Sequence, residues 1–124
     1  MPLSYEIVDE APQVRVTGTG PVTMTGMIDI IGKVALDPFF HSHFTVTLDL
    51  REAKYTAELA DGDALSAVLN QKKSDFQNKF AVVVPEALHF LARLYCALTT
   101  LGGFDKIQCF TNMDEAHYWC RTSP

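Results

Sequence analysis

The feature that most constrains the fold of this sequence is the alternation of short strand patterns with helix patterns along its 124 residues. Two strand patterns come first, at residues 4–10 and 13–18, and a tight connection at residues 9–12 joins them as a hairpin. Three further strands are predicted at residues 44–50, 79–84 and 106–110.

Helical spacing of apolar residues predicts four helices that alternate with these strands. The first begins at Thr23, a suitable N-cap, and ends at Asp37 and Pro38. The others are predicted at residues 61–72, from Pro85 to about Leu101, and at 113–120, where Asn112 is a suitable N-cap. Strand–helix–strand units require parallel pairing with right-handed crossovers. The order ββαβαβαβα therefore predicts an α/β fold: an N-terminal β-hairpin and then βαβαβα units in a mostly parallel five-stranded sheet.

The pattern within the strands predicts which faces of this sheet are covered. In segment 44–50 apolar residues alternate with Thr45, Thr47 and Asp49, whereas the stretch FAVVV at 80–84 is apolar throughout. Parallel strands that are covered on both faces are apolar throughout. The sequence therefore predicts helices mainly on one face and a largely polar second face.

The helix predicted from Pro85 to about Leu101 is apolar around most of its circumference. Such a helix must be covered by more than the sheet. Either it lies centrally, flanked by the other helices, or it leaves a surface for a partner or a second copy of the chain. The candidate apolar contact residues are Phe90, Leu94, Tyr95 and Leu98.

Size and charge exclude several classes of protein. The length is that of a single domain, 1–124. The net charge is −5 and the lysines are scattered, so we expect no nucleic-acid surface. We expect neither a signal peptide nor a transmembrane segment, because no apolar run is long enough. The three cysteines form no CxxC pair, which predicts reduced thiols and a cytoplasmic location.

Motifs of known catalytic sites are absent from the sequence. It contains no GxSxG elbow, no HExxH pair and no Walker loop. The segment GTGPVTMTG at 18–26 lies between a strand and a helix, as a dinucleotide loop does, but Thr23 occupies the position of the third glycine. We therefore expect neither an enzyme nor a bound cofactor.

Two histidines lie close together in FFHSHF at 39–44. In an extended segment His41 and His43 point to the same side and could share a metal. No third ligand is identifiable, so the alternative is an exposed loop whose phenylalanines anchor it to the core.

Three stretches, VTLDLREAKYT (46–56), KFAVVVPEALHFLARLY (79–95) and FTNMDEAHYWC (110–120), together resemble the SpoIIAA-like/STAS-like family of small bacterial proteins. The resemblance covers nearly the whole chain. It depends on a strand ending in Asp-Leu-Arg, an apolar strand followed by proline and an apolar helix, and a final helix containing Ala116 and Trp119. It implies a sheet with helices stacked on one side and a relationship to anti-sigma-factor antagonists. Part of this group is also similar to Sec14-type lipid-binding domains.

The resemblance also implies where a regulatory site would lie. In the anti-sigma-factor antagonists a kinase phosphorylates a serine in an Asp-Ser-Ser/Thr-Gly motif after the third strand, and the added charge switches partner binding. In that register residues 57–60 of this chain occupy the motif, and none is a serine. Thr56 is then either a turn or cap hydroxyl or a modification site, with Tyr55 the other hydroxyl nearby. Glu58 could act as a fixed negative charge there.

The stretch TLDLREAKYTAE at 47–58 contains the candidate interaction site. Open α/β sheets bind ligands beyond the carboxyl ends of their parallel strands. We expect the strand to end at residue 50, followed by a candidate interaction loop that carries Arg51, Glu52, Tyr55, Thr56 and Glu58.

Two functions of different class fit these observations. The first is a non-enzymatic module that binds a protein partner, or itself as a homodimer, through this loop and the apolar helix. The second is a carrier of a small apolar or lipid-like ligand held between helices and sheet. Its pocket would be lined by residues that could equally fill a close-packed core: Met24, Met27, Phe39, Phe40, Phe44 and Phe90.

Overall fold

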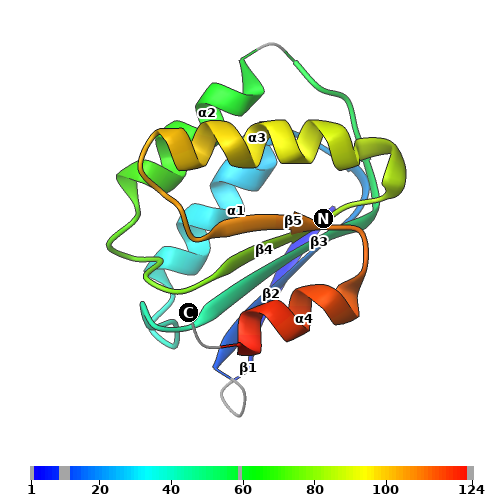
Figure 1. Ribbon diagram of the computed structural model, residues 1–124. Coiled ribbons are helices and arrows are strands. Elements are labelled where there is room, and N and C mark those ends of the chain that lie inside the picture. The colour runs from blue at the N-terminus through cyan, green and yellow to red at the C-terminus, as the bar shows by residue number, and fades with distance from the viewer. Residues whose placement is uncertain (1, 9–11, 59, 123–124) are drawn as a thin grey trace.

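The computed structural model describes residues 2–8, 12–58 and 60–122 (Figure 1). The strands are β1 (Leu3–Val8), β2 (Gln13–Val22), β3 (Thr45–Tyr55), β4 (Phe80–Val83) and β5 (Ile107–Phe110). The helices are α1 (Met24–Leu36), α2 (Asp61–Gln71), α3 (His89–Leu101) and α4 (Met113–Arg121), with a single 3-10 turn, η1 (Glu86–Leu88), before α3.

The strands pair in chain order, β1-β2-β3-β4-β5. β1 is antiparallel to β2, and every other pair is parallel. The predicted order of elements, the leading hairpin and the mostly parallel sheet are confirmed. Of the connection predicted at residues 9–12, residues 9–11 lie outside the described residues.

Two of the predicted helix starts are confirmed by their capping bonds. The Thr23 hydroxyl accepts a hydrogen bond from the Gly26 amide at 3.0 Å, and the Asn112 side chain accepts one from the Glu115 amide at 3.1 Å. These caps satisfy amide groups that a helix leaves unpaired at its start.

Helices α1, α2 and α3 cover one face of the sheet, and α4 lies against the other (Figure 1). The main core lies beneath the first three helices and is formed by alternate residues of the strands, such as Val46 and Leu48 of β3. The prediction that helices lie mainly on one face is confirmed.

The second face is polar over only part of its width. Over β2 and β3 it presents polar side chains such as Arg15, Thr17 and Asp49. Over β4 it is apolar, and Ala116 of α4 packs there in a small cluster with Ala81 and Val83 of β4 and Phe110 of β5, while Gln108 of β5 is exposed. The apolar pattern of residues 80–84 predicted this coverage of β4, so the expectation of a largely polar second face is wrong only for β5, where Phe110 is buried under α4.

Candidate functional site

The candidate interaction loop is mostly strand in the structure. β3 continues to Tyr55, five residues beyond the predicted end, and pairs there with an extension of β2. Arg51, Glu52 and Tyr55 therefore belong to β3, and only Thr56 and Glu58 lie in the connection to α2. The prediction failed because two segments with weak strand propensity pair with each other, which satisfies their backbone groups.

A β-bulge in β3 changes the direction of its side chains. Thr17 pairs with Asp49 and Thr19 with Glu52, so two residues of β3 lie opposite Gly18. A bulge of this kind adds one residue to a strand and shifts the alternation of its side chains. Tyr55 consequently points toward the helices.

Arg51 lies on the opposite face of the sheet, the face of α4. Its guanidinium makes two hydrogen bonds of 3.0 Å with the Asp49 carboxylate. Burial acts to raise the pKa of Asp49, but the bonds and charge of Arg51 outweigh it and lower this pKa. Arg51 is therefore held by Asp49, and it does not share a surface with Tyr55.

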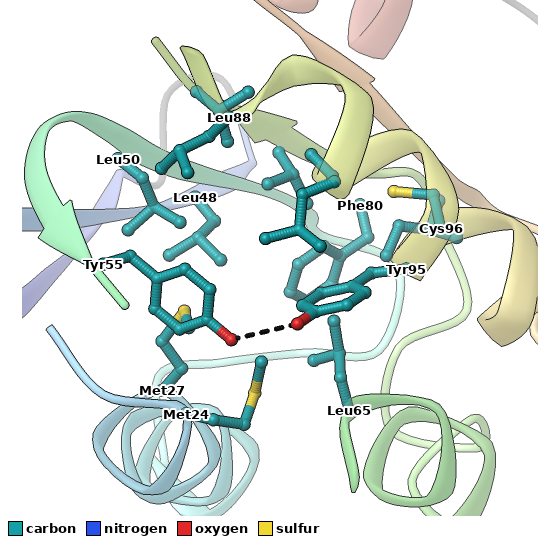
Figure 2. Close-up of a pocket in the computed structure, with 15 residues that line it drawn as sticks. Met24, Met27, Leu48, Leu50, Tyr55, Leu65, Phe80, Leu88, Tyr95 and Cys96 are labelled. Carbon is teal, nitrogen blue, oxygen red and sulfur yellow. Dashed lines mark hydrogen bonds between the residues drawn. The ribbon is translucent and has the colours of Figure 1, made fainter. Parts of the chain in front are cut away.

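Tyr55 connects the predicted loop with the predicted contact helix. Its hydroxyl donates a hydrogen bond to Asp61 at the start of α2 and lies 3.3 Å from the Tyr95 hydroxyl of α3 (Figure 2). Asp61 also accepts a hydrogen bond of 3.1 Å from the Glu58 amide. Burial, followed by the bonds to Asp61 and Tyr95, raises the pKa of Tyr55, so its hydroxyl stays protonated.

The bond between Asp61 and Tyr55 was not predicted from the sequence. The two residues are six positions apart, across a loop whose geometry a sequence pattern does not give. A tyrosine followed by an acid at the next helix start is the only signal that the sequence offered.

An apolar cavity of about 50 Å³ lies next to this hydrogen-bonded group, between the sheet and α1, α2 and α3. Figure 2 shows Tyr55 and Tyr95 facing each other across this space, with Met24 and Met27 of α1 beneath them. Fifteen residues line the cavity, nearly all with apolar side chains. The cavity can therefore hold only a small apolar group unless α3 moves.

The residues expected to line a ligand pocket divide into three groups. Met24 and Met27 line the cavity. Phe40 and Phe44 are buried in the same main core but do not line the cavity, and their ring centroids lie 5.9 Å apart. Phe39 and Phe90 are exposed, so the predicted lining is wrong for all four phenylalanines.

The candidate contact residues of α3 also divide. Phe90 and Leu94 face outward, with 81% and 47% of their surface exposed, and Leu101, which the prediction did not include, is 84% exposed. Tyr95 and Leu98 instead lie over Gly62 of α2, where an added Cβ would be 3.0 Å from either side chain. α2 is the helix that contacts both α1 and α3, so of the two alternatives for α3 the central position is wrong.

The structure places the remaining candidate residues, Thr56, His41, His43 and Cys96, at separate positions. Thr56 is exposed, and Ala60, not Thr56, is the N-cap of α2. His41 and His43 are exposed with their rings stacked 6.0 Å apart, and no third metal-binding side chain joins them among the described residues. Burial is the main cause that raises the pKa of Cys96 to about 12, so this thiol stays protonated.

No helix in the described ranges is long and apolar enough to cross a membrane.

Comparison with known proteins identifies the fold. No family model matches the chain, and no curated protein matches it. A solved structure of an uncharacterised protein of the DUF3478 family from Shewanella loihica, described as having a SpoIIAA-like fold, is similar with a TM-score of 0.60. The match covers 95% of this chain and 91% of that protein at 15% sequence identity. Since the similarity spans nearly the whole length of both proteins, the chain has a SpoIIAA-like fold.

Proposed function

We propose that this protein is a non-enzymatic interaction module that contacts another protein through the outer face of α3. The observation that carries the proposal is a stripe on this helix formed by Phe90, Leu94, Ala97 and Leu101, spaced to lie on one side. All four residues are exposed. Exposed apolar patches of this kind mark interaction surfaces more often than chance allows.

The stripe suits a second copy of the chain. In an antiparallel pair of α3 helices with a twofold axis between Leu94 and Ala97, Phe90 of each copy lies opposite Leu101 of the other. Leu94 then lies opposite the small Ala97, so large and small side chains alternate across the contact. Arg93 is the only charged residue of α3, so little charge repulsion opposes this pairing.

The test is the mass of the protein in solution, measured by sedimentation or light scattering over a range of concentrations. We expect a dimer that Leu94→Glu dissociates, with at least a tenfold rise in the dissociation constant, because a charge would be buried in the contact. The matched control is Leu36→Glu at the end of α1, which is 85% exposed and lies outside the stripe.

A monomer at all concentrations would reject the homodimer, and the stripe would then need a different protein partner. Equal dissociation by Leu94→Glu and Leu36→Glu would reject the stripe as the contact surface.

The apolar cavity favours a second candidate function, the carrier of a small apolar or lipid-like ligand. At about 50 Å³ the cavity is smaller than the ~150 Å³ that holds benzene in a protein interior. The carrier function therefore requires the Tyr55–Tyr95 contact to separate so that α3 moves outward. Native mass spectrometry distinguishes the two functions: an adduct of small-molecule mass, released on denaturation, would support the carrier, whereas bare protein would support the module.

A further inference from the structure

A cleft of about 540 Å³ opens on the second face of the sheet, away from α3. α4 packs over β4 and β5 on this face and also contacts β3, where Thr47 is buried, whereas Arg15 and Thr17 of β2 stay exposed beside it. The cleft is lined by Gln13 and Arg15 of β2, Thr45 of β3, and His117 and Arg121 of α4, among others. A smaller hollow of about 200 Å³ shares Arg15 and His117 with it.

The charge of this cleft is opposite to that of the whole chain. Its described lining contains two arginines and two histidines, Arg15, Arg121, His43 and His117, and no carboxylate. The one ion pair within the described ranges joins Arg51 and Asp49. Neither Arg15 nor Arg121 is therefore in direct contact with a described carboxylate, in a protein whose net charge is −5.

The acidic groups around the cleft lie at its edge. Glu6 of β1 is the cross-strand neighbour of Arg15, and Asp114 lies one turn before His117 on α4. Asp49 is held by Arg51. These carboxylates weaken the positive charge without removing it.

His117 lies among more positive than negative side chains. Burial lowers the pKa of His117 first, and the charges of Arg15 and Arg121 lower it further, more strongly than Asp114 raises it. Arg51 acts in the same direction as the other two arginines. The charged groups around the imidazole therefore make a net positive environment, which favours a bound anion.

Lys79 fixes the end of α4 that carries Arg121. Its ammonium donates hydrogen bonds of 2.8 Å to the Trp119 carbonyl and 2.7 Å to the Thr122 carbonyl. A helix ends in unpaired carbonyl groups with partial negative charge, and Lys79 satisfies two of the carbonyls there. The helix end beside the cleft is thus both anchored and less repulsive to an anion.

We propose that this cleft binds the phosphate group of a small organic phosphate, with Arg15 and Arg121 as its charged ligands and His117 as a further hydrogen-bond donor. Guanidinium groups bind phosphate oxygens in pairs of charge-assisted hydrogen bonds. The cleft is larger than a phosphate group requires, and Gln13 and Thr45 supply polar contacts for hydroxyl groups of the organic part.

The test is a titration of the labelled protein with inorganic phosphate and with ribose 5-phosphate, followed by NMR at constant ionic strength. We expect saturable shifts at Arg15, His117 and Arg121, a raised pKa of His117 on binding, and tighter binding of the sugar phosphate. Arg15→Gln and Arg121→Gln should each weaken binding at least about tenfold. Arg93→Gln on α3 removes the same charge from the opposite face and should leave binding unchanged.

The absence of saturable shifts with both probes would overturn the proposal. It would also be overturned if Arg93→Gln weakened binding as much as Arg15→Gln and Arg121→Gln do. Equal affinity for inorganic phosphate and ribose 5-phosphate would overturn the claim that the cleft also contacts the organic part of the ligand. Because two arginine variants are tested separately, loss of folding in one leaves the other as a test. The cleft and the α3 stripe lie on opposite faces, so failure of one proposal does not affect the other.

Discussion

At the scale of single residues, His117 is the group whose environment most clearly predicts a pH effect on stability. Its pKa in the folded protein is lowered, mainly by burial and then by Arg15 and Arg121. The unfolded chain therefore binds more protons at His117 than the folded protein does as the pH falls through about 6.5. Protonation of His117 therefore favours the unfolded chain, and the protein loses stability as the pH falls.

We therefore expect the free energy of unfolding to decrease between about pH 7 and pH 5, and to decrease less in His117→Gln. Urea unfolding at several pH values measures this difference. His41→Gln removes an exposed imidazole instead and should retain the wild-type slope. If the free energy of unfolding of His117→Gln depended on pH as in the wild type, His117 would not be the group that causes the loss of stability.

At the scale of secondary structure, the β-bulge opposite Gly18 determines the course of β3. A Cβ atom at Gly18 would lie 2.9 Å from Leu50, closer than Cβ atoms approach other side chains, and 3.1 Å from Leu3, a tight contact. Glycine thus permits β2 to pass the bulge closely, and the bulge turns Tyr55 toward Asp61 and Tyr95.

Gly18→Val should therefore destabilise the protein by about 1–3 kcal/mol, because the added methyl groups overpack this contact. The matched control is Gly32→Ala in α1, where an added Cβ meets nothing within 4 Å. Alanine there should stabilise the helix by about 0.5–1 kcal/mol. Denaturant unfolding measures both values. A neutral Gly18→Val would show that Leu50 and Leu3 move aside without cost.

The elements predicted from the sequence are those whose pattern is local. The Thr23 and Asn112 caps and the apolar β4 were predictable, since capping and burial depend on neighbouring residues. The extension of β3 was not, because its residues gain strand geometry only by pairing with β2. The same reason applies to the site: Tyr55 and Tyr95 were each predicted as candidates, but only the folded chain shows that their hydroxyls meet.

At the scale of the whole molecule, the two faces of the sheet hold separate apolar clusters. The larger lies under α1, α2 and α3, and the smaller joins α4 to β4 and β5. β4 contributes to both, since Phe80 and Val82 face one cluster while Ala81 and Val83 face the other. A strand shared in this way couples the two clusters.

We therefore expect the predicted single domain to unfold in one transition. Trp119 is the only tryptophan of the chain and lies in the smaller cluster, with its ring 5.6 Å from that of Phe110. Its fluorescence reports the smaller cluster, whereas far-UV circular dichroism reports all helices. The two signals should change at the same urea concentration. A fluorescence change at lower urea would show that α4 unfolds as a separate unit.

The strand order β1-β2-β3-β4-β5 also has a consequence for folding during synthesis. Each strand from β2 onward leaves the ribosome after a neighbour with which it pairs. It can therefore add to the edge of the existing sheet, and no strand has to insert between two earlier ones. α4 is made after all five strands, so Ala81 and Val83 of β4 stay uncovered on the nascent sheet until it emerges. This apolar strip is therefore the surface at which a chaperone or a second nascent chain would meet the unfinished protein.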